Sequence, residues 1–156
     1  MISIIILNYN AGNLLIDCIS SIMNSNLKDF EIILVDNCSS DNSHLDCKKK
    51  FDSIKLIENK ENLGYCEGNN VGLRAAHGDF LMILNPDTTV TPDWADELLS
   101  AYQKFGEGLY QPKILSMSEP KRLGTTGNIV NIFGFGFSRG RGEIDADQYN
   151  KIENIG

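Results

Sequence analysis

Short runs of apolar residues, many of them β-branched, alternate along the chain with segments whose apolar residues recur at helical spacing. The runs predict buried strands, because a strand of a parallel sheet is covered on both faces and lacks polar alternation. They occupy residues 2–7, 31–35, 54–57, 79–84 and 110–115. Apolar residues at helical spacing predict helices over residues 14–23 and 92–105. Ser40-Asp41 offers a cap for a short helix over residues 46–51, and His77-Gly78 supplies the stop of a helix over residues 67–76. This alternation predicts an α/β fold: a mostly parallel sheet with helices on both faces.

The pattern weakens in the last quarter of the chain. Residues 123–142 are rich in Gly, Asn and Thr, which predicts loops and an irregular hairpin. We therefore expect an α/β core over residues 1–116, followed by a Gly- and Asn-rich irregular segment over residues 117–156. The length of 156 residues and the apolar fraction of 42% fit a single domain over residues 1–156.

Composition narrows the classes of partner. The formal net charge is −7 and the pI about 4.7, so the chain lacks the excess of Lys and Arg with which proteins bind nucleic acid. A phosphorylated ligand would instead need a metal ion or backbone amides to offset its charge. The longest apolar runs, such as residues 80–84, are far shorter than the roughly 20 residues that cross a bilayer. We expect a cytoplasmic protein; peripheral membrane association and self-association through an unfinished sheet edge are left open.

Polar and aromatic residues follow four of the predicted strands, at the edge of a parallel sheet where ligands bind. They are Asn8, Tyr9 and Asn10 after the first strand, Asp36 and Asn37 after the second, the loop 59–65 after the third, and Asn85, Pro86 and Asp87 after the fourth. A single polar residue at a strand end is commonly a cap or a turn former. Four ends that all carry such residues exceed what a core requires and indicate a binding site.

Motifs of several other α/β classes are absent from the sequence. The first strand is not followed by the GxGxxG of dinucleotide-binding folds, and neither the P-loop GxxxxGK[ST] nor the hydrolase GxSxG occurs. His44 and His77 are both expected at the surface, where His77 helps to end a helix, so a His-based catalytic triad is not expected. The four cysteines lack zinc-ligand spacing, and Cys18 is expected in the core.

Two carboxylates that directly follow apolar strands have complementary uses. Asp36 and Asp87 should both project into the crevice beyond the sheet edge. One can hydrogen-bond a base or ribose, and the other can ligate a divalent cation. Such a cation bridges two phosphates and, as a Lewis acid, takes up the charge of a departing diphosphate. The ring of Tyr9 can stack on a base.

Four blocks of the sequence, colinear over residues 2–115, resemble family 2 glycosyltransferases of the GT-A fold, and most of all their rhamnosyltransferase-like branch. The blocks are ISIIILNYNAGNLLIDCISSI, EIILVDNCSSDNS, ENLGYCEGNNVGLRAAHGDFLMILNPDTTV and TPDWADELL. The resemblance implies a Rossmann-like α/β/α sandwich that binds a UDP- or dTDP-sugar. It also implies transfer of the sugar to a glycan or lipid-linked acceptor, with bacterial polysaccharide synthesis as the setting.

Carried onto this sequence, the family pattern implies a set of nucleotide-binding residues. They are Asn8, Tyr9, Asn10, Asp36, Asn62, Gly64, Asn70 and Asn85. Tyr9 would pack on the base, and Asp36 would contact the pyrimidine ring. Asp87 would occupy the last position of the family's DXD motif and ligate Mg²⁺ or Mn²⁺. The motif here is Asn85-Pro86-Asp87, similar to the NPD of the rhamnosyltransferase-like branch, and the missing carboxylate should weaken metal binding.

The resemblance further implies an acceptor half that carries the general base of an inverting transfer. The acids near the end of the chain stand in no matching motif, and we assign no catalytic base. They are Glu143, Asp145, Asp147 and Glu153. Arg139 and Arg141 would either approach the diphosphate or acceptor or remain solvated loop charges. We expect the N-terminal donor-binding part of a longer glycosyltransferase; the alternatives are a binding module without turnover and an unrelated α/β domain.

Overall fold

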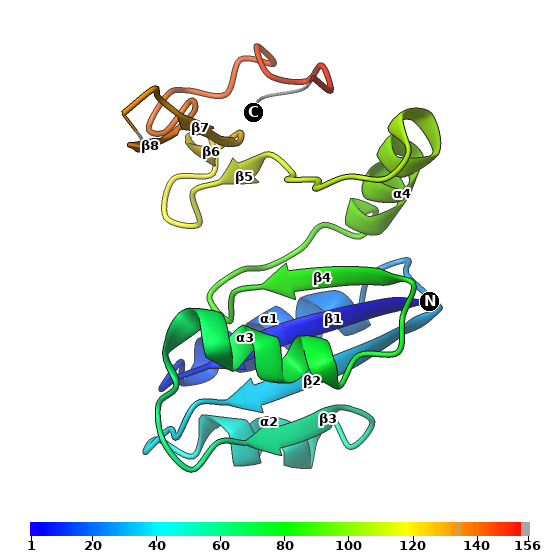
Figure 1. The fold of residues 1–156 in the computed structure, drawn as a ribbon, viewed down its shortest axis with the longest axis vertical. Coiled ribbons are helices and arrows are strands. Elements are labelled where there is room, and N and C mark those ends of the chain that lie inside the picture. Colours follow the sequence, from blue (N-terminus) through cyan, green and yellow to red (C-terminus); the bar gives the residue numbers. More distant parts are fainter. Residues whose placement is uncertain (134, 154–156) are drawn as a thin grey trace. The chain divides into compact units, whose positions relative to one another are not determined.

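The computed structural model describes residues 1–133 and 135–153. The chain forms two compact units, Met1–Ala95 and Asp96–Gly156, and helix α4 (Trp94–Phe105) begins in the first and continues in the second. The first unit contains a four-stranded sheet, and the second contains two small antiparallel sheets (Figure 1). The organisation of residues 1–156 as one domain stays a prediction.

The sheet of the first unit consists of four parallel strands in the order β3-β2-β1-β4. Their bounds are Ile2–Asn8 (β1), Phe30–Asp36 (β2), Lys55–Glu58 (β3) and Phe80–Leu84 (β4). β1 and β2 are central and carry the core, in which Ile4 and Ile5 are fully inaccessible. The register pairs Asn8 with Asp36 and Asp36 with Glu58, so three strands end together at one edge of the sheet.

Three helices cover the two faces of this sheet. They are α1 (Asn13–Met23), α2 (Ser43–Lys50) and α3 (Gly64–Arg74). α3 lies on one face and α1 and α2 lie on the other (Figure 1). α3 packs closely on β1 because glycines face the strand: a Cβ added at Gly72 would lie 2.5 Å from Ile5 Cγ2, and one at Gly68 would lie 2.5 Å from Leu7 Cδ1. The predicted α/β class, with helices on both faces of a parallel sheet, is confirmed.

The first four predicted strands and all four predicted helices are present, with ends that differ by at most three residues. The largest differences are at helix starts. α2 begins at Ser43 instead of residue 46, because the left-handed Asn42 (φ 59°) turns the chain into the helix and Asp41 Oδ1 accepts the N–H of Ser43 at 3.0 Å. The helix therefore includes His44 in its first turn.

The second unit contains two antiparallel strand pairs, β5 with β6 and β7 with β8. The bounds are Ile114–Leu115 (β5), Leu123–Thr125 (β6), Asn128–Val130 (β7) and Gly136–Ser138 (β8). The prediction of a strand over residues 110–115 is wrong in extent and pairing, since two residues form the strand and they join β6 instead of the parallel sheet. Pro112 has no N–H for a ladder, and Ile114 and Leu115 are exposed instead of buried. The irregular hairpin expected in this region is confirmed.

Arg139 contacts separate segments of the second unit. Its Nε donates a hydrogen bond to Thr126 Oγ1 at 3.1 Å, and its Nη1 pairs with Glu153 at 2.8 Å. The guanidinium also lies over the ring of Tyr149, 4.9 Å from the centroid. With 20% of its side chain exposed, Arg139 is not a solvated loop charge, whereas Arg141 is exposed.

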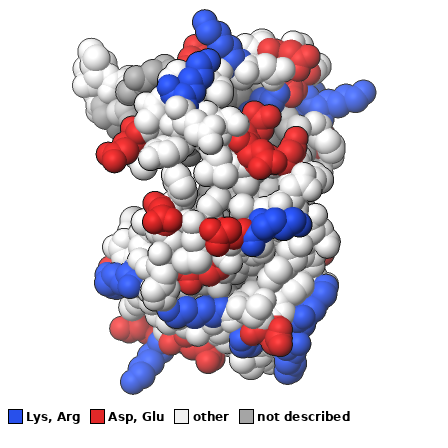
Figure 2. Space-filling model, turned by 90° about the vertical axis from the view of Figure 1, so that its right-hand side faces the viewer, with Lys and Arg blue, Asp and Glu red and all other residues white. Residues whose placement is uncertain are grey.

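Charge is distributed without a dominant sign on the face of the molecule that Figure 2 shows. Acidic and basic side chains are interspersed there, and the basic ones form no continuous surface on that face. Among the described residues, no helix combines the length and the apolar character needed to cross a membrane.

Candidate functional site

A pocket of about 560 Å³ opens at the carboxyl edge of the parallel sheet, within the first unit. Its lining comes from the end of β1 and the loop after it, from α1, and from the segments after β2, β3 and β4. The lining residues are Leu7, Tyr9, Ala11, Leu14, Asn37, Asn62, Gly64, Tyr65, Asn85, Pro86 and Asp87. Small-molecule sites typically occupy roughly 300–1,000 Å³. The pocket therefore has a suitable size and lies where the strand-end residues predicted a site.

Two exposed tyrosine rings stand in this lining. Tyr9 follows β1 and is 54% exposed, and Tyr65, at the start of α3, is 59% exposed. The Tyr65 hydroxyl donates a hydrogen bond to Asn85 Oδ1 over 3.4 Å and so connects α3 with the segment after β4. Exposed aromatic faces of this kind are surfaces on which a planar ring can stack. The sequence predicted this role for Tyr9; for Tyr65 it gave only a place in the polar loop 59–65.

Asn37 fixes one wall of the pocket. It is 2% exposed. Its Nδ2 donates to Asn62 Oδ1 at 2.7 Å and to the carbonyl of Gly64 at 3.3 Å. Its Oδ1 accepts from Asn59 Nδ2 at 3.1 Å and from the N–H of Leu63 at 3.0 Å. Because a side-chain amide has two donor and two acceptor positions, Asn37 is fully used in holding this loop. The sequence placed Asn37 at a strand end but assigned it no role.

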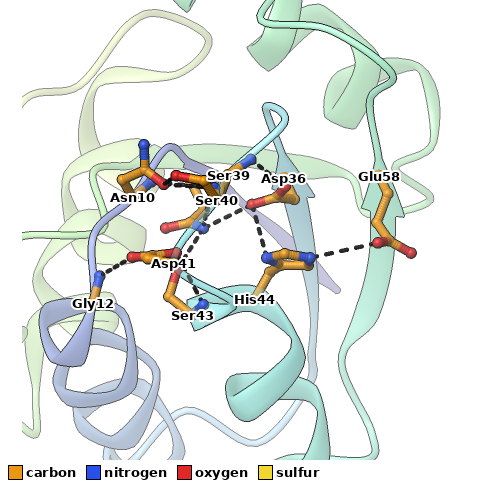
Figure 3. A network of polar contacts seen from close by, with 10 residues as sticks. Asn10, Gly12, Asp36, Ser39, Ser40, Asp41, Ser43, His44 and Glu58 are labelled. Atoms are coloured by element: carbon orange, nitrogen blue, oxygen red, sulfur yellow. Dashed lines mark hydrogen bonds and ion pairs between the residues drawn. The ribbon is translucent and has the colours of Figure 1, made fainter.

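Asn8 and Asp36 do not line the pocket. Asp36 belongs to a polar network at the same edge of the sheet (Figure 3), and Asn8 joins this network through hydrogen bonds to Asp36 and Ser43. Asn8 is fully buried, and Asp36 is 2% exposed. Asn8 Nδ2 donates to Asp36 Oδ1 at 2.8 Å, and the N–H of Ser39 donates to Asp36 Oδ2 at 2.9 Å. These bonds hold the carboxylate in one orientation.

The network continues from Asn8 to the loop after β1 through Ser43 and Asp41. Asn8 Nδ2 donates to Ser43 Oγ at 2.9 Å, and that hydroxyl donates to Asp41 Oδ1 at 2.7 Å. Asp41 Oδ2 accepts the N–H of Gly12 at 3.0 Å. Desolvation raises the pKa of Asp41, but the hydrogen bonds from Ser43 and Gly12 outweigh it and hold that pKa below its ordinary value.

Asn10 braces the loops around the pocket without lining it. Its Oδ1 accepts the N–H of Ser40 at 2.8 Å, which joins the loop after β1 to the loop after β2. Asn10 has a left-handed backbone (φ 54°), a conformation that Asn tolerates better than most residues. Asn62 and Gly64 do line the pocket, so the structure brings these two predicted residues together with Tyr9.

Two residues lie elsewhere than the sequence suggested. Asn70 is exposed on α3, donates to Glu67 at 3.2 Å and is not part of the pocket lining. His44 was expected at the surface, and that expectation is wrong, because the early start of α2 places it in a turn where it is 5% exposed. Its Nδ1 lies 3.3 Å from Asp36 Oδ1, and its Nε2 lies 3.4 Å from Glu58 Oε1.

Comparison with known sequences identifies the family. The sequence model of glycosyl transferase family 2 matches residues 3–151. The chain belongs to this family. A glycosyltransferase of Haemophilus influenzae, itself uncharacterised, is 30% identical over 131 residues, which cover 82% of this chain and 41% of the relative. This family 2 chain thus spans about two fifths of the length of that relative.

Solved structures of glycosyltransferases share the fold of this family 2 chain. S. aureus TarS 1–349 in complex with UDP-GlcNAc superposes with a TM-score of 0.61 at 19% identity, over 76% of this chain and 41% of TarS. A mannosyltransferase from Pyrobaculum calidifontis in complex with GDP-Man and Mn²⁺ gives a TM-score of 0.58 at 21% identity, over 68% of this chain and 32% of that one. The predicted GT-A fold is confirmed.

The residues implied as the metal site of this family 2 chain supply only part of a coordination shell of oxygen ligands. Asn85 and Asp87 are both exposed in the pocket lining and offer an amide oxygen and a carboxylate. Within residues 1–133 and 135–153, no three His, Cys, Asp or Glu side chains gather into a metal-binding cluster. Mg²⁺ commonly takes one or two carboxylates and completes its shell with phosphate oxygens and water. The residues present fit a cation that binds in that way.

Proposed function

We propose that this chain is the donor-binding part of a glycosyltransferase that transfers a sugar from a nucleoside-diphosphate-sugar to an acceptor hydroxyl. The observation that carries this proposal is the pocket, in whose lining the exposed rings of Tyr9 and Tyr65 stand together with Asn85 and Asp87. The aromatic surface suits a base, and the oxygen ligands suit a metal-bound diphosphate. Membership of glycosyl transferase family 2 supports the reaction class.

Asp36 is 2% exposed and outside the pocket lining. A base that reaches past the lining residues to this carboxylate would be a pyrimidine with a protonated N3. The Asp36 carboxylate accepts hydrogen bonds from Asn8 Nδ2 and the Ser39 N–H and has acceptor positions left over. Uracil and thymine carry a donor at N3, whereas cytosine carries an acceptor there. A base that reaches Asp36 is therefore recognised as uracil or thymine, which favours a UDP- or dTDP-sugar as the donor.

Asp87 and Asn85 would hold Mg²⁺ or Mn²⁺ together with the diphosphate. The bound cation supplies Lewis-acid stabilisation of the diphosphate leaving group. Asn85 contributes a neutral oxygen, and the Tyr65 hydroxyl, 3.4 Å away, orients its amide. Because this pair carries a single negative charge, we expect the cation to bind well only when the diphosphate is also present.

A second candidate function is donor binding without turnover by this chain alone. The acids considered for a general base each contact a neighbour inside the second unit. The pairs are Glu143 with Tyr149, Asp145 with Lys113, Asp147 with Asn150, and Glu153 with Arg139. In the first candidate, an inverting transfer to a glycan or lipid-linked acceptor, the base comes from another source. A role in bacterial polysaccharide synthesis in the cytoplasm is part of the first candidate and rests on the family.

Calorimetric titration with UDP, dTDP and GDP, each with and without Mn²⁺, tests the proposal. We expect saturable binding of UDP or dTDP that Mn²⁺ strengthens about tenfold, or about 1.4 kcal/mol. Asp87→Asn should remove the effect of Mn²⁺ and leave UDP binding in the absence of Mn²⁺ unchanged. Asp93→Asn is the matched control, since Asp93 is exposed but lies outside the pocket lining.

The outcomes separate the candidates. Failure to bind any of the three nucleotides would overturn donor binding and with it both candidates. If the nucleotide binds, release of UDP from a UDP-sugar that depends on an added acceptor supports transfer, and binding without such release supports the second candidate.

A further inference from the structure

The ring of His44 lies between two carboxylates that end neighbouring strands (Figure 3). Asp36 closes β2 and Glu58 closes β3, and the two residues are register partners. His44 Nδ1 lies 3.3 Å from Asp36 Oδ1, and Nε2 lies 3.4 Å from Glu58 Oε1. His44 and Asp36 are both almost fully buried, whereas 60% of the Glu58 side chain is exposed. One ring nitrogen thus faces the buried network, and the other faces a carboxylate at the surface.

His44 is the basic group that accompanies Asp36. Among the described residues, no Lys or Arg lies within ion-pair distance of Asp36, and the basic side chain that contacts this carboxylate is His44. The Nδ1 atom is buried, and its approach to Asp36 is not aligned as a hydrogen bond, so no partner satisfies it fully. A buried polar atom without a partner is costly, which makes a better contact with Asp36 favourable.

The contacts of Asp36 leave one open acceptor position. A carboxylate has about two acceptor positions on each oxygen. Asn8 Nδ2 and His44 Nδ1 face Oδ1, and the N–H of Ser39 faces Oδ2. The remaining position is on Oδ2. With Nδ1 against Oδ1, the oxygen left to accept the N3–H of a base is Oδ2.

On this basis, and resting on the proposed donor site, we propose that His44 is a positioning residue that orients Asp36 through Nδ1 and thereby sets the selectivity for uracil or thymine over cytosine. His44 does not touch the base; it acts through Asp36. Without the Nδ1 contact, the bonds from Asn8 Nδ2 and the Ser39 N–H remain, and we expect them alone to hold Oδ2 less firmly toward the N3–H of a base.

Two amide substitutions separate the ring nitrogens. In His44→Asn the amide nitrogen takes the place of Nδ1 and faces Asp36. In His44→Gln it takes the place of Nε2 and faces Glu58. His44→Phe keeps the ring and removes both nitrogens. His77→Gln is the matched control, because His77 Nδ1 also lies 3.4 Å from a carboxylate, that of Glu31, but 69% of the His77 side chain is exposed and it is not among the pocket residues.

The measurement is the ratio of the Kd values for UDP and CDP, by calorimetry with Mn²⁺ present. We expect the unaltered chain to prefer UDP by about tenfold or more, since a site built around a hydrogen bond rejects a ligand that cannot form it. His44→Asn and His77→Gln should keep that preference. His44→Gln and His44→Phe should reduce it to about threefold or less through weaker UDP binding, with CDP binding unchanged.

A spectroscopic readout does not depend on the folding of any His44 variant. The chain has two histidines, so the imidazole signals of His77→Gln come from His44 alone. We expect UDP to shift these signals and CDP to leave them near their free positions.

A preference for UDP that survives in His44→Gln and His44→Phe, or that is lost equally in His44→Asn, would overturn the positioning role while the donor site stands. Equal binding of UDP and CDP by the unaltered chain would also overturn it. Absence of all nucleotide binding would instead overturn the proposed function itself.

Discussion

Individual side chains at the carboxyl edge of the sheet occupy two environments with different consequences for mutation. Tyr9 and Asp87 are exposed in the pocket lining, so their replacement should change ligand binding with little effect on folding. Asn8, Asp36 and Asn37 are almost fully buried and hydrogen-bonded. Removal of one of these groups leaves its buried partners unsatisfied, so both stability and binding should fall.

Asp36→Asn tests this coupling at the centre of the network. One of the two carboxylate oxygens becomes an amide nitrogen, which then faces a donor, either Asn8 Nδ2 or the Ser39 N–H. We expect a loss of about 1–3 kcal/mol in the free energy of unfolding and at least about tenfold weaker UDP binding. Urea unfolding and calorimetry measure the two effects. A variant as stable as the unaltered chain would show that the network does not constrain Asp36.

The four cysteines should fall into two classes of reactivity. Desolvation raises the pKa of Cys18 to about 12 and that of Cys47 to about 11. Cys38 and Cys66 are exposed. At pH 8 we expect a thiol reagent to modify the exposed pair quickly and the buried pair only on unfolding, as mass spectrometry of the labelled chain can show. The confirmed core position of Cys18 agrees with the sequence prediction.

The same two pKa shifts predict a loss of stability at high pH. A thiol whose folded pKa is raised contributes stability below its unfolded pKa of about 8.5, and this contribution is lost as the pH rises and the unfolded chain releases its protons. Alanine at residues 18 and 47 should make the fall in the free energy of unfolding with rising pH smaller. In the labelling experiment, rapid modification of Cys18 in the folded chain would contradict the burial of its thiol.

At the scale of elements, the contact between α3 and β1 depends on a pair of glycines. The two positions differ in what a methyl group would meet: the branched Ile5 and Val35 at Gly72, and the end of the Leu7 side chain at Gly68. Ile5 and Val35 are fully buried in the sheet, whereas Leu7 is partly exposed. The helix should therefore tolerate a larger residue better at position 68 than at position 72.

Gly72→Ala should destabilise the first unit in spite of the higher helix propensity of alanine. The propensity gain is about 1 kcal/mol, and overpacking a rigid core costs about 1–3 kcal/mol. We expect a lower urea midpoint with an unchanged m-value. Gly68→Ala is the control and should change the midpoint much less, because Leu7 can rotate away. Equal effects of the two substitutions would show that α3 shifts as a whole.

Features of the first unit that depend on local sequence could be predicted, whereas features that depend on contacts between distant segments could not. The strands were predictable because each is an apolar run, and Tyr9, Asn85 and Asp87 because they follow strands directly. The sequence marks a cap at Ser40-Asp41, and Asp41 Oδ1 accepts the N–H of Ser43 at 3.0 Å, but no sequence pattern marks the left-handed Asn42 between them. The burial of His44 and the bonds of Asn37 follow from loops that meet only in space, so the sequence could not reveal them.

At the scale of the whole molecule, the pocket and the contacts of Arg139 belong to different units. Every pocket-lining residue lies within Met1–Ala95, whereas the contacts of Arg139 lie within Asp96–Gly156. A substitution in the second unit can therefore be used to ask whether that unit takes part in donor binding.

Arg139→Ala should lower the thermal stability of the second unit and leave the Kd for UDP unchanged. The substitution removes the pair with Glu153, the bond to Thr126 and the contact with the Tyr149 ring, together about 1–3 kcal/mol. Arg141→Ala, at an exposed position, is the control and should change neither. Weaker UDP binding in Arg139→Ala would revive the alternative in which this guanidinium approaches the diphosphate.

The position of β4 in the sheet determines the order in which the strands can pair while the chain is translated. β1 precedes the other three strands of this sheet in the chain and leaves the ribosome before them, yet one of its neighbours is β4, so Ile2 can pair with Phe80 only after residue 80 is made. β2 and β3 can dock on β1 earlier, and with them the network around Asp36. The segment Asn85-Pro86-Asp87 directly follows β4. During synthesis the nascent chain would therefore complete its base-recognition side before its diphosphate side.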